Sequence, residues 1–165
     1  MLLLTCFISG LLGSLTWAGP QGRTVCPSST FAYRDGSEWY CFKFSEEQLA
    51  FDDAEEECQN RWKGHLASFN METQAKSIGA YVTKENMEST DVWIGLRRNV
   101  GSSVNTGWRW IDGSRSRYRS WSYKEPNNGG SNEFCGSLDH RYGHVSWNDL
   151  ACGRPRPFLC KWKPI

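Results

Sequence analysis

The first half of the chain contains two stretches in which apolar residues recur every three or four positions, the spacing of one face of an α-helix. They are Phe51, Ala54 and Cys58 with Trp62, and Ala75 and Ile78 with Val82. The segment Ser45 to Gln48 has the form of a capping box before the first stretch, and Gly64 can end that helix in a left-handed cap. Asn70 can cap the second helix, which is expected to fade near Asn86 to Thr90. The pattern predicts two amphipathic helices.

Shorter apolar runs between polar and glycine-rich segments predict β-strands. One run precedes the helices, one lies between them, and the others follow residue 91. The predicted strands are Tyr40 to Phe44, His65 to Phe69, Val92 to Leu96, Trp108 to Ile111, a piece near Val145 to Trp147, and Phe158 to Trp162. Because the later strands alternate with long loops rather than with further helices, the order predicts an α+β fold.

The N-terminus begins with an apolar run from Leu2 to Leu15, and Thr16 and Ala18 follow at the spacing that a signal peptidase reads. About a dozen apolar residues are too few to span a bilayer, which needs about 20, and no later run approaches that length. We therefore expect residues 1–18 to be a cleaved signal peptide and residues 19–25 to be a short lead without heptads. Residues 26–165 are then expected to form one secreted domain.

The cysteines indicate disulfides rather than a metal centre. Cleavage would remove Cys6 and leave an even set without Cys-x-x-Cys pairs, and in an oxidising compartment such a set predicts three disulfides. The six are Cys26, Cys41, Cys58, Cys135, Cys152 and Cys160. Spacing alone leaves their pairing open, and with all six paired any oligomer of the chain would be non-covalent.

Composition, charge and the lack of catalytic motifs disfavour two classes of function, nucleic-acid binding and catalysis. Nine Trp, six Tyr and eight Phe indicate a compact core of large rings. A formal net charge of +1 gives no reason to expect nucleic acid as a partner. The chain has no nucleophile elbow and no metallohydrolase motif, which favours a binding module over an enzyme.

Acidic and amide residues gather in the loops on either side of Cys135. They are Glu125, Asn127, Glu133, Asn148 and Asp149. Their side chains supply only hard oxygen ligands, which suit Ca²⁺ rather than Zn²⁺ or copper. Glu-Pro-Asn by itself would also suit an ordinary turn, but together the five residues predict a calcium-dependent site.

Several short motifs in a fixed order resemble the C-type lectin-like domain, and the match extends from Cys26 to Lys161. They are Trp93-Ile94-Gly95-Leu96, Trp108-Arg109-Trp110 with Asp112-Gly113, Trp147-Asn148-Asp149, and Phe158-Leu159-Cys160-Lys161. The resemblance implies two helices, short antiparallel sheets and a long calcium-binding loop. It also implies the disulfides Cys26–Cys41, Cys58–Cys160 and Cys135–Cys152. A single domain of this kind is similar to the small secreted lectins of the regenerating (pancreatic stone), reptile-venom and eggshell types.

The same resemblance assigns both metal and carbohydrate binding to one set of residues, namely Glu125, Asn127, Glu133, Asn148 and Asp149. In the family, Glu-Pro-Asn accompanies mannose-type sugars, Gln-Pro-Asp accompanies galactose, and the proline is typically cis. The acidic ligands of a second ion are replaced here by Arg97, Arg98, Asn128 and Phe134, so we expect one Ca²⁺. The expected function is calcium-dependent binding of terminal mannose, fucose or N-acetylglucosamine on glycans or microbial polysaccharide.

Alternatives come from the basic residues and from two histidines. Arg115, Arg117 and Arg119 would face one side of a strand and could hold anionic polymers, although a solvated charged face is the commoner outcome. The alternative function is therefore a non-catalytic lectin-like protein that adsorbs to anionic glycan, mineral or cell-wall polymer. His140 and His144 could chelate a metal if they were helical, but in this loop they are expected to be solvated.

The remaining assignments concern the core and the rim of the site. The tryptophans Trp93, Trp108, Trp110 and Trp147 are expected to be packed in the core rather than to stack on sugar. The loop beyond Cys135 borders the predicted site, and the candidates for its rim are Asp139, His140, Tyr142, His144, Val145 and Leu150.

Overall fold

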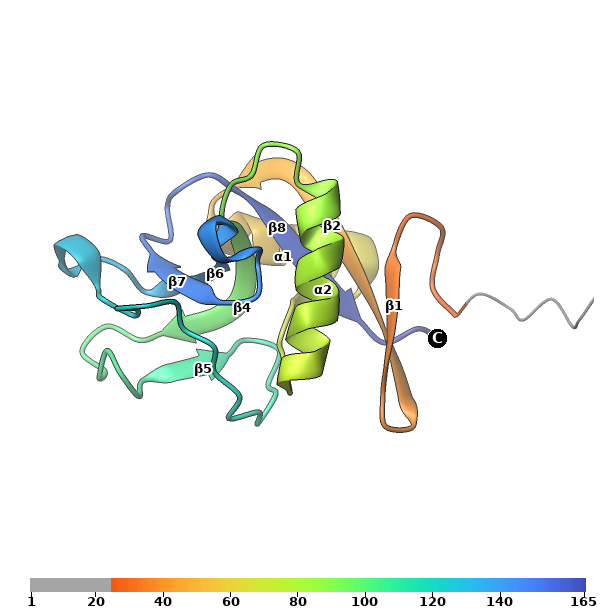
Figure 1. Ribbon diagram of the computed structural model, residues 1–165, viewed down its shortest axis with the longest axis horizontal. Helices are drawn as coiled ribbons and strands as arrows, with labels where there is room; N and C mark the ends of the chain where they lie inside the picture. Colours follow the sequence, from red (N-terminus) through yellow and green to blue (C-terminus); the bar gives the residue numbers. More distant parts are fainter. Residues whose placement is uncertain (1–24) are drawn as a thin grey trace, which may run out of the picture.

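A computed structural model describes residues 25–165 of the chain (Figure 1). Its elements are β1 (Phe31–Asp35), β2 (Glu38–Leu49), α1 (Phe51–Trp62), β3 (His65–Leu66), α2 (Glu72–Glu85), β4 (Val92–Arg98), β5 (Trp108–Trp110), β6 (Cys135–Leu138), β7 (Trp147–Leu150) and β8 (Arg156–Trp162), with 3₁₀ turns at Gly129–Ser131 and His140–Tyr142. Within residues 25–165, no helix has the length and apolar character needed to cross a membrane. The predicted signal peptide and all but the last residue of the lead lie outside the described residues.

The strands form one sheet in the order β1-β2-β8-β4-β6-β7, with β3 paired to β8 and β5 paired to β4. The ladders are antiparallel apart from the contact of β4 with β8, where Trp93 pairs with Phe158 in parallel. The α+β prediction is confirmed. The sequence did not predict β1 or β6, because their residues alternate weakly or are small and polar.

The two helices lie on opposite sides of the central strands (Figure 1). Phe51, Ala54 and Cys58 of α1 are fully buried in a cluster with β3, β4 and β8. On the other side, the predicted apolar face of α2 packs against Phe42 and Ile94 of the sheet. Each large apolar side chain buried in this way contributes about 1.5–3 kcal/mol, so the helical periodicity identified the packed faces correctly. The four tryptophans expected in the core are also buried, namely Trp93, Trp108, Trp110 and Trp147.

The predicted start of the first helix is wrong. Ser45 to Gln48 continue β2, in which Ser45 pairs with Phe158 of β8, and α1 begins only at Phe51. Its N-cap residue is Ala50, which makes no side-chain cap. The capping-box pattern is a weak local preference, and the sheet hydrogen bonds with β8 outweigh it. The second predicted cap is wrong as well, since Met71 precedes α2 and the Asn70 amide donates to Asp35 at 2.6 Å.

The end of α1 differs from the prediction in an informative way. Lys63, not Gly64, adopts the left-handed conformation, with φ of 53°. Gly64 is required for a different reason, because a Cβ at this position would collide with the carbonyl oxygen of Lys161 in β8. The following strand is also shorter than predicted and comprises only His65 and Leu66.

The three implied disulfides are confirmed as Cys26–Cys41, Cys58–Cys160 and Cys135–Cys152. The second joins α1 to the last strand across 102 residues of chain. The third joins the start of β6 to the segment that follows β7 and so closes the hairpin that carries Asn148 and Asp149.

Candidate functional site

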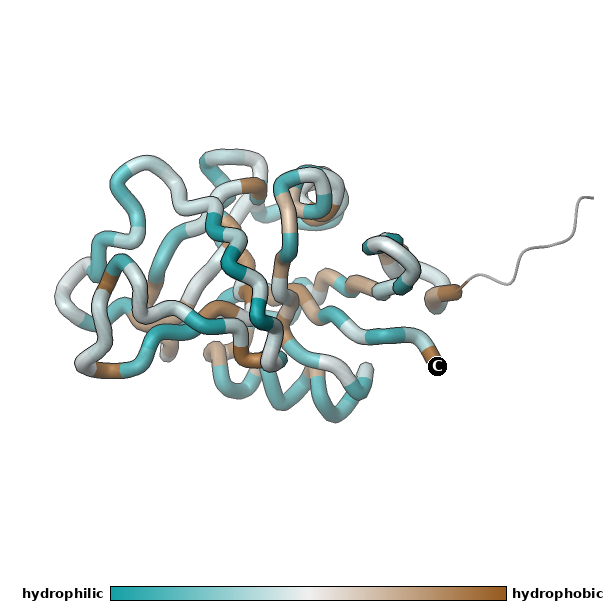
Figure 2. Tube along the Cα trace, turned by 90° about the horizontal axis from the view of Figure 1, so that it is seen from below, coloured by the Kyte–Doolittle hydropathy of each residue, from teal (hydrophilic) through white to brown (hydrophobic). Residues whose placement is uncertain are grey.

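Three residues of the predicted site, Glu125, Asn127 and Glu133, lie in the long segment between β5 and β6, which contains no α-helix and no named strand, and the other two lie in β7. This segment is anchored to Trp147 of β7, which donates its backbone N–H to Ser120 and accepts a hydrogen bond from Ser122 at 2.8 Å. The Trp147 ring is fully buried between aromatic side chains that include Trp110 and Trp121. The loops at the end of the molecule opposite the C-terminus are mainly hydrophilic or neutral in Figure 2. An aromatic core thus supports a polar end.

Asp149 holds the Glu-Pro-Asn segment against β7. Its buried carboxylate accepts the backbone N–H of Asn127 at 3.0 Å and that of Asn128 at 2.8 Å. The peptide bond between Glu125 and Pro126 is cis, as the resemblance implied. Glu125 and Asn127 are therefore fixed beside Asp149, although the two segments are more than 20 residues apart in sequence.

Glu133 and Asn127 meet over Gly129. The Glu133 carboxylate accepts the backbone N–H of Gly129 at 2.6 Å. A Cβ at Gly129 would lie 2.9 Å from Oε2 of Glu133 and 3.2 Å from Oδ1 of Asn127. The absence of a side chain there leaves space in which a carboxylate oxygen and an amide oxygen face each other.

Glu125 is the least compensated acid in this group. Its side chain is 8% exposed, and Oε2 has no hydrogen-bond partner among the described residues. Burial, and then the nearby Asp149 carboxylate, raise the pKa of Glu125 to about 7, while the Arg141 guanidinium opposes the rise. Burial also raises the pKa of Glu133, with Asp149 acting in the same direction and the Gly129 N–H against it. Three acids that repel one another, one of them with an orphaned oxygen, fit a bound cation.

Asn148 is the predicted ligand that the structure does not join to the other four. Its Nδ2 donates to Asp91 at 3.3 Å, and within residues 25–165 no hydrogen bond joins its side chain to the other four. Another group of possible metal ligands lies nearby. In the described part of the chain, Asp91, Asp139 and His140 are the acidic or histidine residues that form a group of three with ligand atoms all within 4.8 Å of one another. Hydrogen bonds within the protein already engage both carboxylates of that group.

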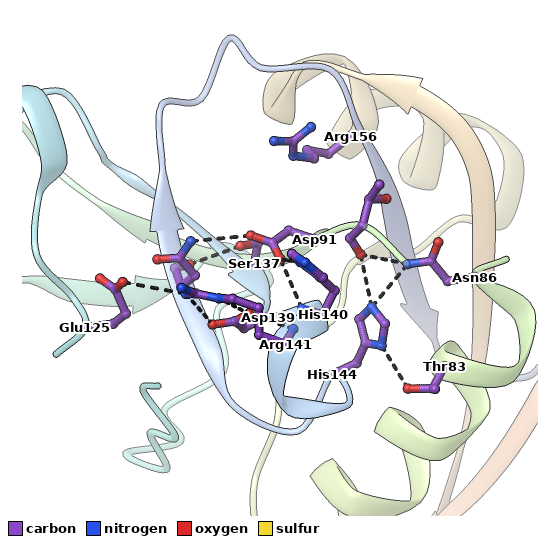
Figure 3. A network of polar contacts seen from close by, with 12 residues as sticks. Thr83, Asn86, Asp91, Glu125, Ser137, Asp139, His140, Arg141, His144 and Arg156 are labelled. Carbon is purple, nitrogen blue, oxygen red and sulfur yellow. Dashed lines mark hydrogen bonds and ion pairs between the residues drawn. The ribbon is translucent and has the colours of Figure 1, made fainter. Parts of the chain in front are cut away.

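The loop between β6 and β7 is more tightly packed than its sequence predicts. His144 is 2% exposed and bridges Thr83 of α2, at 2.8 Å, and the carbonyl of Thr90, at 3.0 Å (Figure 3). Burial lowers the pKa of His144, which favours the neutral ring. The expectation that His144 is solvated is therefore wrong, because α2 packs against this loop. His140 remains partly exposed and pairs with Asp91 at 2.7 Å.

The rim residues divide into buried and exposed positions. Asp139 is fully buried and Leu150 is packed in the core, so neither forms part of an open rim. Tyr142 is 47% exposed and Val145 is partly exposed. Tyr142, Val145 and the exposed His140 can therefore meet a ligand at the surface.

Arg98 has a structural role that its sequence position did not reveal. It is 3% exposed, and its Nη2 donates to Oδ1 of Asn128 at 2.8 Å and to the carbonyl of Glu133 at 2.9 Å. Its guanidinium carbon lies 4.4 Å from the centroid of the Phe134 ring. A buried cation thus braces the loop beside the acidic group.

The three alternating arginines do not form one face. Arg119 donates to the carbonyls of Trp108 and Tyr118 and lies over the Trp110 ring, which makes it part of the scaffold. Arg115 and Arg117 are exposed, and their segment is not a strand. The expected common orientation is wrong because these residues follow an irregular loop.

Comparison with known proteins agrees with this geometry. Residues 47–162 match the family model described as the lectin C-type domain. The chain is 39% identical over 129 residues to C-type lectin lectoxin-Lio1 of Erythrolamprus poecilogyrus, covering 78% of this chain and 77% of the relative. It is 31% identical over 144 residues to human lithostathine-1-beta, covering 87% and 82%.

A crystal structure of human lithostathine is similar, with a TM-score of 0.75 at 31% identity, covering 91% of this chain and 99% of that one. The fold, the three disulfides and the matched residues all point to the same family. The chain belongs to the C-type lectins, which are carbohydrate-binding proteins and not enzymes.

Proposed function

We propose that this protein is a secreted lectin that binds mannose, fucose or N-acetylglucosamine in a calcium-dependent way. The observation that carries the proposal is the buried, unpartnered Oε2 of Glu125, which lies beside Asp149 and Glu133. Leaving a buried carboxylate oxygen without a partner is costly. A divalent cation would satisfy that oxygen and remove the repulsion among the three acids.

The residues that would hold the ion are all oxygen donors, namely Glu125, Asn127, Glu133, Asn148 and Asp149. When bound, calcium would offer coordination positions to two neighbouring sugar hydroxyls. The two glutamates can accept hydrogen bonds from those hydroxyls, and the amide groups of Asn127 and Asn148 can donate to them. For Asn148, one amide N–H is already engaged by Asp91, which leaves the other N–H and the carbonyl oxygen for the site.

A single ion suits the surroundings of this group. The buried Arg98 guanidinium binds the same loop through Asn128 and Glu133, and it places a positive charge where a second cation would be repelled. With one ion on an irregular loop, the expected calcium affinity is in the weak extracellular range of about 10⁻⁴–10⁻³ M. One sugar per site also binds weakly, so useful avidity would require a multivalent surface or a non-covalent oligomer.

Retention on mannan-agarose tests the proposal. The purified protein should bind in calcium, elute with mannose and elute with a chelator. In the double variant Glu125→Gln with Asn127→Asp, the exchange of acid and amide positions swaps hydrogen-bond acceptor for donor, and preference should move toward galactose while calcium still binds. Equal retention with and without chelator would rule the proposal out, and an unchanged sugar ranking in the double variant would discredit the assigned residues.

Adsorption to anionic polymer is the alternative function. Arg115 and Arg117 support it because both are exposed, whereas Arg119 is engaged with the scaffold. Retention on heparin that falls with salt and survives chelation would favour this alternative over calcium-dependent sugar binding.

A further inference from the structure

Arg141 is held in a fixed position by a buried acid. Its Nε donates to Oδ1 of Asp139 at 2.9 Å, and its Nη2 donates to Oδ2 at 2.7 Å. The backbone N–H of Arg141 also donates to Asp139, at 3.0 Å. The Asp139 side chain is fully buried, so this two-point contact fixes the orientation of the guanidinium plane. Binding of a ligand by Arg141 would then cost little further side-chain entropy.

The held guanidinium faces the predicted sugar site. Its Nη2 lies 3.9 Å from Oε1 of Glu125, and the two side chains approach each other from different loops (Figure 3). A separation of 3.9 Å is too long for a hydrogen bond, so Glu125 does not saturate the group. The Arg141 side chain is 55% exposed, and within residues 25–165 no hydrogen bond engages its Nη1. One edge of the guanidinium is therefore free beside Glu125.

The charges around the predicted site would admit an anion once a metal is bound. The acids Glu125, Glu133 and Asp149 carry three negative charges when ionised, and a divalent cation leaves one. Arg141 stands at one side of this group, and the Arg154 guanidinium is close enough to Glu133 to act on its ionisation. Counted together with Asp139, which pairs with Arg141, the four carboxylates carry four negative charges, and the divalent cation and the two arginines balance them. The loaded site would thus no longer repel an anionic group, and the exposed Arg141 guanidinium would be the positive group that meets it.

We propose that the site prefers sugars that carry an anionic group, a phosphate, sulfate or carboxylate, and that Arg141 is the residue that recognises this group. The proposal rests on the calcium-dependent sugar site described above. The hydroxyl pair would be bound at Glu125 and its neighbours, and the anionic substituent would reach the free edge of the Arg141 guanidinium. Planar guanidinium groups pair with oxyanions through two parallel hydrogen bonds, which a lysine cannot reproduce.

Titration calorimetry in saturating calcium with mannose and with mannose 6-phosphate tests the proposal. The wild-type protein should bind mannose 6-phosphate about tenfold more tightly than mannose, the size of effect expected for one charge-assisted contact. Arg141→Gln should abolish this preference and leave mannose affinity within about twofold. Arg141→Lys, which keeps the charge opposite the buried Asp139, should retain only part of the preference.

The matched control for the Arg141 variants is a substitution of Arg154. Arg154→Gln removes another exposed arginine near the same acids and should keep most of the preference, which separates a specific contact from net charge. Equal wild-type affinities for the two sugars, a preference that survives in both Arg141 variants, or equal losses in the Arg141 and Arg154 variants would each overturn the proposal. Failure of mannose itself to bind in calcium would instead overturn the proposed function.

Discussion

Calcium affinity should fall steeply as pH falls from 7.5 to 5.5, and Glu125 should account for most of the change. Its pKa in the metal-free protein is raised to about 7 by burial and by the adjacent Asp149. Calcium binding requires the ionised carboxylate, and below pH 7 the proton must first be removed. At pH 7.5 most Glu125 side chains are ionised, whereas at pH 5.5 about 3% are. From this single group we expect a decrease in affinity of about 25-fold, or about 2 kcal/mol.

Isothermal titration with calcium at the two pH values, at constant ionic strength, measures this effect. Glu133, whose pKa is also raised, should add to the decrease. Glu125→Gln removes the main titrating group, so the variant should bind calcium more weakly at pH 7.5 but lose much less affinity on acidification. Equal affinities at pH 7.5 and 5.5 in the wild type, or an undiminished pH dependence in the variant, would refute the reasoning.

Three further predictions concern stability, measured by urea unfolding. Because the pKa of Glu125 is raised, its contribution to the free energy of unfolding in chelator is fully present below pH 4.5 and is lost as pH rises through about 7. The loss should be about 1–2 kcal/mol after solvent screening, and Glu125→Gln should remove this pH dependence. Gly64→Ala should cost about 2–3 kcal/mol because its Cβ meets a backbone carbonyl of β8, whereas Gly153→Ala, which meets nothing within 4 Å, should be nearly neutral. Replacing both Cys58 and Cys160 by Ser should cost about 4–5 kcal/mol because their loop spans 102 residues, and a cost near zero would contradict that.

The parts of the fold that could be predicted are those governed by local periodicity. Ala75, Ile78 and Val82 recur at helical spacing, and all three are buried on one face of α2. The start of α1 could not be predicted in this way, because Ser45 to Gln48 satisfy a helix-capping pattern that the ladder with β8 overrides. The role of Gly64 likewise depends on the carbonyl of Lys161, which is nearly 100 residues away in sequence.

The candidate site also has features that the sequence predicts and features that depend on tertiary contacts. The residue types at Glu125, Glu133 and Asp149 indicated an oxygen-ligand site, and in the structure Asp149 and Glu133 lie close enough to Glu125 to raise its pKa. The burial of His144 could not be read from a glycine-flanked loop, because it depends on α2 packing against that loop through Thr83. The bracing of the loop by Arg98 also depends on tertiary contacts, since its partners lie 30 or more residues further along the chain.

A crystal structure of the protein grown with calcium and mannose would test the central claim most directly. We predict one ion at about 2.3–2.6 Å from oxygens of Glu125, Asn127, Glu133, Asn148 and Asp149, with two adjacent mannose hydroxyls completing its coordination. An ion bound instead at Asp91, Asp139 and His140, or a mannose bound away from any ion, would contradict the account.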